Sequence, residues 1–236
     1  MSLGTLSDPS ASHPLQGPKL WLLPLQGVGD FANLSARELC WGDELSPLQA
    51  SRYKHSRAAL RQVLAGELRC EPAVVPLHSP PGGPPCLAEG IGHISLSHSG
   101  DGLLIGYAQQ PIGVDLEPAR RSFDARILMR RFFPTAEQAQ LELLVGDGLR
   151  EAVLTSWVLK EAAIKWRHRS LAAELSQWCY DHRSGRLQHQ GDGVWPECRS
   201  AVTAGWRWAA VGAGCQGLDV DPQSAAGIFK KDAELH

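Results

Sequence analysis

SWVLKEAAIKW, residues 156–166, is the stretch from which the rest of the chain can be interpreted. On a helical wheel of about 100° per residue, Val158 and Ala162 fall within a broad apolar face, which predicts a helix packed on a core. Glu161 and Lys165 lie one turn apart, beside that face. Such a pair is usually a surface pair that stabilises a helix by a few tenths of a kcal/mol. The alternative is that the two charges line a functional site. Other segments of the sequence are needed to choose between these two interpretations.

The composition limits the classes of protein that the chain can belong to. Of its 236 residues, 43% are hydrophobic and 20% are charged, which is typical of a globular protein with one large or two small domains. The net charge of −2 predicts no general attraction to nucleic acid or to a membrane surface, so an anion site must be built locally. There is no run of about 18 apolar residues that would span a membrane. Six scattered cysteines and no secretory signal predict reduced thiols in a cytoplasmic protein.

The expected elements follow the order helix, strands, helices, strands, which favours the α+β class over a regular βαβ alternation. Ser46 as N-cap and a proline at the first helical position predict the first helix. Residues 80–85 contain only prolines and glycines and predict an exposed loop. The turn at 109–111 predicts an antiparallel hairpin between its flanking strands. We expect helices at 46–68, 123–133, from 135 after a TAEQ capping box, and at about 149–168, and strands at 93–100, 102–108, 112–117, 178–190 with a turn at 184–185, and 205–214.

GVDLEP, residues 113–118, places two carboxylates on one side of an expected strand. Asp115 and Glu117 are two positions apart, so both emerge on the same face with their Cα atoms about 7 Å apart. Mg²⁺ is commonly held by one or two carboxylates together with substrate phosphates and water, and this pair suits it. The alternative is an amphipathic strand with one solvated face, as in many half-exposed sheets.

SLSHSG, residues 95–100, combines serine hydroxyls, an imidazole and a glycine, which together can bind a phosphate. The alternative is a histidine that is hydrogen-bonded for structural reasons only. A serine hydrolase is disfavoured because the chain has no G-x-S-x-G motif. A zinc site is not expected, because His93 and His98 are five positions apart with no cysteine beside them in sequence.

In this order, the three segments resemble the motifs of one family, the Sfp-type 4′-phosphopantetheinyl transferases. Its patterns G-(V/I)-D and W-x-x-K-E-(A/S)-x-x-K are met by residues 113–115 and 157–165, and the resemblance extends over about residues 45–214. The resemblance implies an enzyme that moves the phosphopantetheine arm of coenzyme A to a serine of an acyl or peptidyl carrier protein and releases 3′,5′-ADP. The carriers can belong to fatty-acid, polyketide or nonribosomal-peptide synthesis, and the sequence does not choose among them.

The same resemblance implies roles for the charged residues. Mg²⁺, with Mn²⁺ as an alternative, would be held by Asp115, Glu117 and Glu161. Glu117 is the least secure of these ligands, since some family members lack a carboxylate there. Glu161 is also implied as the general base, taking the serine proton directly or through water. Lys165 is implied as a second catalytic residue that holds a diphosphate oxygen as a point charge.

The resemblance also implies which residues bind coenzyme A. Ser97 and His98 would meet the 3′-phosphate end, and either Arg52 or Arg61 would add positive charge. The loop Gly83, Pro84 and Pro85 would lie against the adenine. Many family members have a lysine at the position of Pro84, so this chain lacks one cation there.

The fold that the resemblance implies consists of two similar α/β subdomains related by pseudo-twofold symmetry, with the active site in the cleft between them. We expect a mobile tail at 1–18, subdomains at 19–110 and 111–215, a C-terminal tail at 216–236, and a protein that acts as a monomer. Four arginines between the two acidic motifs are candidates for docking an acidic carrier: Arg120, Arg121, Arg130 and Arg131. Two other functions stay open. One is a Mg²⁺-dependent phosphohydrolase that uses the same carboxylates with water in place of the serine. The other is a carrier-binding module without activity, which Asp115, Glu117, Glu161 and Lys165 disfavour because binding alone would not require them.

Overall fold

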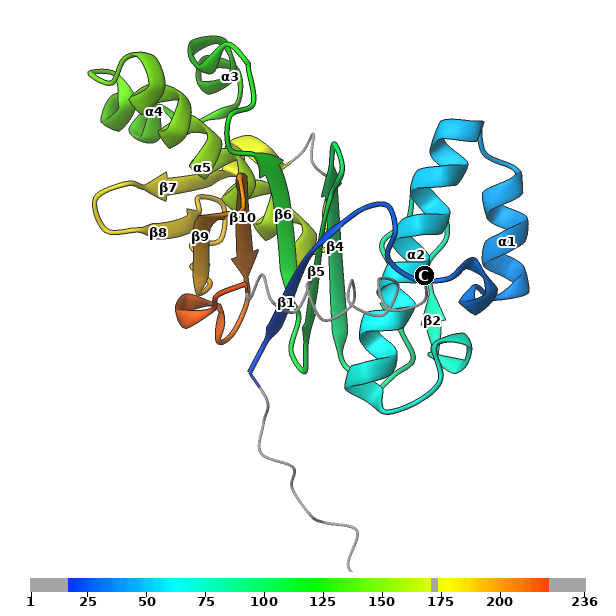
Figure 1. The fold of residues 1–236 in the computed structure, drawn as a ribbon. Helices are drawn as coiled ribbons and strands as arrows, with labels where there is room; N and C mark the ends of the chain where they lie inside the picture. Colours follow the sequence, from blue (N-terminus) through cyan, green and yellow to red (C-terminus); the bar gives the residue numbers. More distant parts are fainter. Residues whose placement is uncertain (1–16, 171–173, 221–236) are drawn as a thin grey trace, which may run out of the picture.

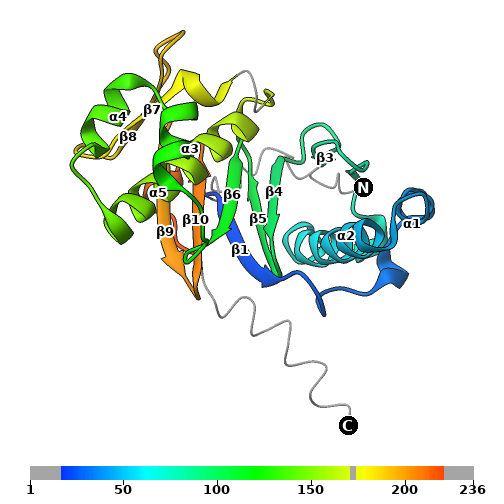
Figure 2. The same cartoon turned by 90° about the horizontal axis from the view of Figure 1, so that it is seen from above.

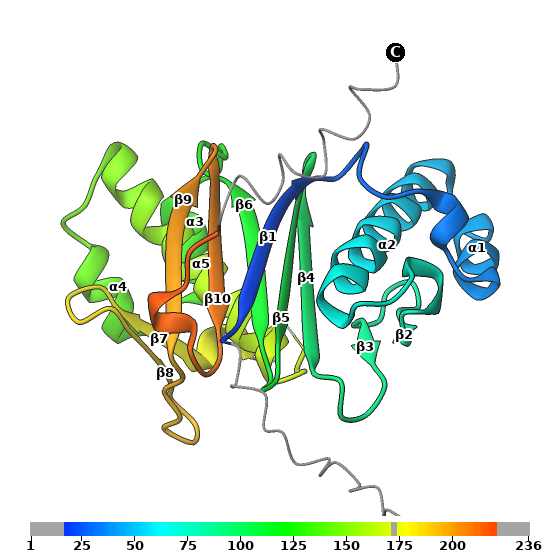
Figure 3. The ribbon, with the colours of Figure 1, turned by 60° about the horizontal axis from the view of Figure 1, so that its bottom comes forward.

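The computed structural model describes residues 17–170 and 174–220, and these form a four-layered α+β fold, as expected (Figure 1). Two three-stranded antiparallel sheets lie face to face, and each carries a long helix on its outer side (Figure 3). The first sheet contains β1 (Lys19–Pro24), β4 (His93–Ser99) and β5 (Gly102–Ala108), covered by α2 (Pro47–Leu68). The second contains β6 (Gly113–Pro118), β9 (Cys198–Thr203) and β10 (Trp206–Val211), covered by α5 (Gly146–Trp166).

The two sheets and their helices repeat one topology. Each half runs strand, long helix, two-stranded hairpin, strand, strand, and the sheet orders β1-β5-β4 and β6-β10-β9 correspond (Figure 2). The hairpins are β2 (Leu77–His78) with β3 (Cys86–Leu87), and β7 (Trp178–Asp181) with β8 (Arg186–His189). Shorter helices precede the long ones, namely α1 (Ala36–Asp43), α3 (Ala125–Phe132) and α4 (Thr135–Leu141). The expected similarity of the two halves is therefore present in the strand order, while the subdomain limits at 19–110 and 111–215 stay predictions.

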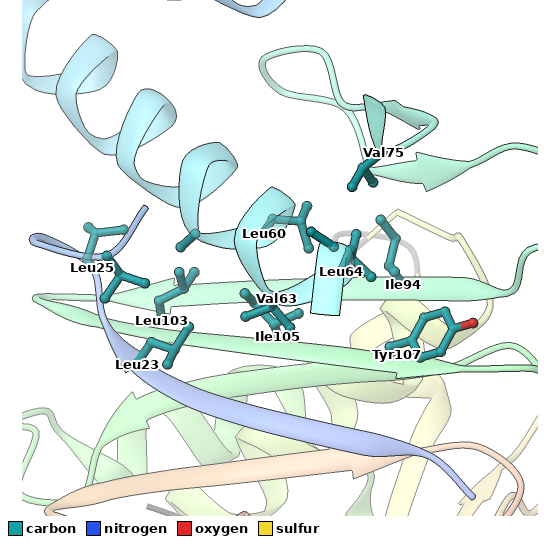
Figure 4. Packing of buried hydrophobic residues seen from close by; sticks show 13 residues of the cluster. Leu23, Leu25, Leu60, Val63, Leu64, Val75, Ile94, Leu103, Ile105 and Tyr107 are labelled. Atoms are coloured by element: carbon teal, nitrogen blue, oxygen red, sulfur yellow. The ribbon is translucent and has the colours of Figure 1, made fainter. Parts of the chain in front are cut away.

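Helix α2 forms because its sequence supplies both a start and a buried side. Ser46 is the N-cap residue and a proline follows at the first helical position, although the Ser46 side chain makes no capping hydrogen bond. Leu60 and Leu64, one turn apart, are fully buried. They belong to one buried cluster with Leu103 and Ile105 of β5, and this cluster fills the space between α2 and the first sheet (Figure 4). This packing fixes the position of α2, and so also the position of the α2 residue that lines the cleft, Arg57.

The two sheets are held together by an apolar interface, not by strand pairing. Leu104 of β5 packs with Val114 and Trp208 from the second sheet. The approach is close, since a Cβ atom at Gly106 would lie 2.6 Å from Val114 Cγ1. The expected hairpin between 102–108 and 112–117 is therefore wrong: β5 pairs with β1 and β4, and β6 pairs with β10.

Helix α5 lies on the second sheet at an unusually short distance from β6. A Cβ atom at Gly113 would lie 1.9 Å from the carbonyl oxygen of Ala162 and 2.5 Å from the backbone nitrogen of Trp166. Only glycine permits this approach without a shift of the helix. The glycine of the GVD motif therefore determines how close α5 comes to the carboxylates of β6.

Other differences from the expected elements are local. Helix α5 begins at Gly146, three residues before the expected start. Helix α4 has Pro134 as N-cap and no side-chain cap, so the capping box expected in TAEQ is wrong. Strands β1, β2, β3 and β9 and helix α1 were not predicted from the sequence. Of the two expected tails, residues 1–16 and 221–236 lie outside the described part of the chain, and no helix of that part is long and apolar enough to cross a membrane.

Candidate active site

A cleft of about 560 Å³ lies where β4, β6, α5, α2 and the loop between β2 and β3 come together. Its lining includes almost every residue that the sequence analysis selected. Those residues are Gly83, Pro84, Pro85, Ser97, His98, Asp115, Glu117, Glu161 and Lys165. The exceptions are Arg52 and Arg61, and Arg57, His168 and Arg169 are present in addition.

Alternate serines of β4 attach this strand to β6 and so form the floor of the cleft. The Ser95 hydroxyl accepts a hydrogen bond from the backbone N–H of Val114 at 3.0 Å. The next serine along the same face, Ser97, donates to Asp115 Oδ1 at 2.8 Å, and Ser99 donates to Glu117 Oε2 at 2.8 Å. The serines of SLSHS therefore orient the two carboxylates of GVDLEP, which joins two of the three motifs in space.

Asp115 is the most buried of the cleft carboxylates, with 3% of its surface exposed. Its Oδ1 atom also accepts from Lys165 Nζ at 2.7 Å, so β6 and α5 are bridged by residues 50 positions apart. Its Oδ2 atom is buried and has no hydrogen-bond partner among the described residues. An unpaired buried carboxylate oxygen that adjoins a cleft is the kind of atom that a cation would satisfy.

Glu117 and Glu161 differ in how their charge is balanced. Glu117 Oε1 forms an ion pair with Arg121 Nη1 at 2.6 Å, while burial raises the pKa of Glu117. Glu161 has no such arginine partner within residues 17–170 and 174–220. Burial, and then the negative charges of Asp115 and Glu117, raise the pKa of Glu161 to about 8, against the opposing effect of Lys165. Asp115 and Glu117 are therefore close enough to Glu161 to disfavour its ionisation.

These residues fit Mg²⁺, although they do not form a finished metal site. Within residues 17–170 and 174–220, no three His, Cys, Asp or Glu side chains are already arranged to hold an ion. Mg²⁺ usually keeps several waters and uses only one or two protein carboxylates with substrate phosphates, so a closed protein cage is not required. The unpaired Asp115 Oδ2 and the Glu161 carboxylate supply oxygen donors of the right type. Glu117 is engaged by Arg121, and this leaves it the weaker candidate.

The opposite side of the cleft carries groups suited to phosphate. Arg57 of α2 is buried and is held by Ser56 Oγ, which accepts from Nη1 at 3.0 Å, and by the Ser79 carbonyl oxygen, which accepts from Nε at 3.4 Å. His98 is exposed at the surface of the cleft. Partial desolvation, then the positive charges of Arg57, Arg52 and Lys165, lower the pKa of His98. A bound phosphate would reverse the effect of these cations.

The structure corrects the expectation for Arg61. Its side chain is 2% exposed and forms an ion pair with Glu38 Oε2 at 2.7 Å. Its Nη1 atom donates to the carbonyl oxygens of Pro72, Ala73 and Val75. Arg61 therefore holds α1 and the segment after α2 in place and does not reach the cleft. Arg57, one turn earlier on α2, takes its place in the lining, while Arg52 is exposed and near enough to lower the pKa of His98.

Comparison with known proteins agrees with this geometry. The model of the 4′-phosphopantetheinyl transferase superfamily matches residues 111–203, which include the carboxylates of β6 and the charged pair of α5. A protein of Synechocystis sp., named provisionally as a 4′-phosphopantetheinyl transferase, is 31% identical over 186 residues, which is 75% of this chain and 76% of that protein. This chain belongs to the 4′-phosphopantetheinyl transferase superfamily.

Two further relatives support the assignment of the chain as a transferase. The 4′-phosphopantetheinyl transferase HetI of Nostoc sp. is 32% identical over 158 residues, covering 62% of this chain and 66% of HetI. The 4′-phosphopantetheinyl transferase Sfp of Bacillus subtilis is 26% identical over 133 residues, or 56% of each chain. The expected family and enzyme class are thereby confirmed.

Besides Arg57, two basic residues of the transferase cleft were not predicted from the sequence. His168 and Arg169 follow the end of α5 and line the cleft on the side of the Gly83–Pro85 loop. His168 adopts a left-handed conformation with φ of 53°, which turns the chain back after the helix. The basic residues just beyond the W-x-x-K-E-A-x-x-K motif were the available signal, but no periodicity indicated their direction.

Lys160, the first lysine of that motif, points away from the cleft. It is fully buried and forms an ion pair with the equally buried Glu137 of α4, with Nζ 2.7 Å from Oε2. Its Nζ atom also lies 3.7 Å from the centre of the Phe133 ring. Glu137 Oε2 accepts a further hydrogen bond from the backbone N–H of Tyr180 at 3.1 Å. Lys160 therefore fixes the rotation of α5 from behind, while Glu161 and Lys165 face the cleft.

Proposed function

We propose that this transferase moves the 4′-phosphopantetheine arm of coenzyme A to a serine hydroxyl of apo acyl or peptidyl carrier proteins, with Mg²⁺, and releases 3′,5′-ADP. The observation that carries this proposal is the composition of a single cleft. The cleft is lined by the carboxylates of Asp115 and Glu161, and it is also lined by the cations Lys165 and Arg57 and by His98. A diphosphate ester with an additional phosphate requires this combination of a cation site and several positive groups.

The reaction forms a bond between the serine oxygen and the phosphorus that carries the pantetheine arm, and it breaks the bond from that phosphorus to the oxygen of 3′,5′-ADP. Glu161 would accept the serine proton, directly or through water. Lys165, now on Asp115 at 2.7 Å, can move to a diphosphate oxygen as a point charge. Mg²⁺ held by Asp115 and Glu161, with Glu117 as a third ligand, would neutralise charge on the diphosphate oxygens.

The nucleotide end of coenzyme A fits the other side of the cleft. Arg57 and His98, with Arg52 nearby, would bind the 3′-phosphate, and the loop Gly83–Pro85 would lie against the adenine. Arg57 is held in place by α2 and therefore loses little freedom on binding. The protein is proposed to act as a cytoplasmic monomer. Light scattering on the purified chain would test the oligomeric state.

Mass spectrometry tests the proposed reaction most directly. Apo-carriers from fatty-acid, polyketide and nonribosomal-peptide systems would each be incubated with the protein, coenzyme A and Mg²⁺. The proposal expects the addition of one phosphopantetheine to at least one carrier, and release of 3′,5′-ADP only when that carrier is present. Release of 3′,5′-ADP without a carrier would instead indicate a phosphohydrolase. Binding of a carrier without any mass change would indicate a module without activity.

A further inference from the structure

A side cavity of about 340 Å³ adjoins the active-site cleft. Pro85, Ile94 and His168 line both the side cavity and the cleft, so the two meet at these residues. Besides histidines and a cysteine, the only polar side chains that line the side cavity, within the described residues, are Glu89 and Gln109. A cavity lined by one carboxylate and by no lysine or arginine disfavours a phosphate. It suits an uncharged base with hydrogen-bonding edges.

The loop of residues 80–85, which lines the cleft beside the side cavity, offers little positive charge to an anionic ligand. Four of its six residues are prolines, which have no amide N–H, and none is a lysine or an arginine. The amide N–H of Gly83 is already donated to the Pro80 carbonyl oxygen at 3.2 Å. A nucleotide that lies against this loop must therefore find its positive partners on another segment of the chain.

The residues that follow α5 supply basic groups at this place. Arg167 is paired with Asp192, with Nη2 2.8 Å from Oδ2, and does not line the cleft. The next two residues, His168 and Arg169, are exposed, line the cleft and make no ion pair with any residue that the structure describes. His168 lines the side cavity as well, whereas Arg169 does not. The chain therefore places a histidine where the two cavities meet and a guanidinium group in the cleft beside it.

The backbone of His168 has a conformation that favours glycine. Its φ angle is 53°, its N–H donates to the Lys165 carbonyl oxygen at 3.0 Å, and the N–H of Arg169 donates to the Ile164 carbonyl oxygen at 3.1 Å. These two hydrogen bonds form the usual helix end in which the left-handed residue is glycine. A side chain at this position costs stability, and residues strained in this way concentrate at ligand sites. The strain therefore indicates that the side chain of His168 has a function.

We infer that His168 is a specificity-determining residue for coenzyme A, whose ring packs on the adenine base where the two cavities meet, and that Arg169 binds a diphosphate oxygen of the same nucleotide. This inference rests on the function proposed above and adds two ligand contacts to it. Packing of a base on an aromatic ring does not depend on the 3′-phosphate. The two histidines of the cleft therefore have different tasks: His98 contacts the 3′-phosphate, and His168 contacts the base.

Replacement of His168 by glycine tests the inference, because stability and affinity should change in opposite directions. H168G removes both the ring and the backbone strain, so Tm should rise by about 2 to 4 °C. The affinity for coenzyme A, measured by calorimetry, should fall about tenfold. Dephospho-coenzyme A should lose affinity by the same factor, because it keeps the base. An unchanged affinity for coenzyme A, or a loss confined to the ligand with the 3′-phosphate, would overturn the inference.

R69G is the matched control for H168G. Arg69 ends α2 in the same left-handed conformation, with φ of 52°, and lines neither the cleft nor the side cavity. The N–H of Cys70 donates to the carbonyl oxygen of Ala65, five residues back, as the N–H of Arg169 does after α5. R69G should therefore raise Tm by a similar amount and leave the binding of both ligands unchanged. If R69G loses as much affinity as H168G, the effect comes from a loosened helix end and the inference fails.

An exchange of charge tests the part assigned to Arg169. R169A should weaken the binding of both ligands about tenfold, and a second change, P84K, should recover part of the loss by placing a cation on the loop. Unchanged binding in R169A, or no recovery with P84K, would contradict the assignment of Arg169.

The outcome of these tests is separate from that of the proposed function. Calorimetry needs no carrier, so the expected losses of affinity would support the inference even if no carrier is modified. Transfer to a carrier together with unchanged binding by H168G would support the proposed function and overturn the inference.

Discussion

Replacement of Gly113 by alanine should damage both stability and activity, because it inserts one methyl group between β6 and α5. The new Cβ atom would lie 1.9 Å from the Ala162 carbonyl oxygen, which is backbone of a packed helix and cannot rotate away. Strand and helix would have to separate by about 1 Å or more. Overpacking of this kind costs about 1 to 3 kcal/mol, which corresponds to a fall in Tm of about 3 to 10 °C for a chain of this size.

The same displacement would reach the active site. Glu161 and Lys165 are carried by the part of α5 that would move, and Lys165 is only 2.7 Å from Asp115. A misplacement of about 1 Å can lower an enzymatic rate about 100-fold. We therefore expect Gly113→Ala to retain its helical circular dichroism, to melt earlier, and to lose about two orders of magnitude in single-turnover transfer rate.

Gly66→Ala serves as the matched control. Gly66 lies inside α2, and a Cβ atom there would meet nothing within 4 Å. This variant should keep full activity and gain about 0.5 to 1 kcal/mol, since alanine is the better helix former. If Gly113→Ala melts and reacts like the wild type, the close approach of α5 to β6 is not what positions the site. Earlier melting with full activity would refute only the link between helix position and rate.

Five other experiments have expected outcomes. Asp115→Ala should lower transfer by about 100-fold or more with unchanged circular dichroism, and retained activity at ordinary Mg²⁺ would contradict its role. His98→Ala should weaken coenzyme A binding by about 1.5 to 3 kcal/mol, and dephospho-coenzyme A, whose affinity should not change, is the control. Because the pKa of His98 is lowered in the free protein and a phosphate raises it, coenzyme A binding should take up a proton below pH 7, and calorimetry in buffers of different ionisation enthalpy measures this. Lys160→Met should cost about 3 to 5 kcal/mol in urea unfolding, since it leaves a buried carboxylate unpaired, and neutralising that carboxylate as well should restore part of the loss. Burial raises the pKa of the Cys215 thiol to about 12, so iodoacetamide at neutral pH should label exposed Cys86 and spare Cys215 until the protein unfolds, which peptide mapping would show.

Local patterns predicted the residues of the cleft well. The two-residue spacing of Asp115 and Glu117 and the four-residue spacing of Glu161 and Lys165 each reflect one element, and a strand or a helix fixes such geometry without tertiary information. The structure places all four in one cleft. The family resemblance supplied what spacing alone lacked, namely that the two elements face each other.

The features that could not be predicted from the sequence depend on contacts between distant segments. Arg57 and Arg61 are one turn apart on α2 and look alike in sequence. The position of Glu38 on α1, together with the backbone carbonyls after α2, makes Arg61 structural. In the same way, the direction of Lys160 depends on Glu137. The hairpin between β5 and β6 was predicted because a short turn usually joins paired strands, whereas here each strand finds its partners elsewhere in the chain.

The apolar interface between the two sheets has a consequence for the order in which the protein is made. Leu20, Leu22 and Leu104 belong to the N-terminal half, and their partners Val114 and Trp208 belong to the C-terminal half. Of the strands in the described residues, β10 is the last to leave the ribosome, about 100 residues after β5. At a translation rate of about 5 to 20 residues per second, one apolar face of the first sheet stays exposed to solvent for roughly 5 to 20 s. The protein is therefore most prone to aggregate during synthesis, while its N-terminal half has formed and its C-terminal half is incomplete.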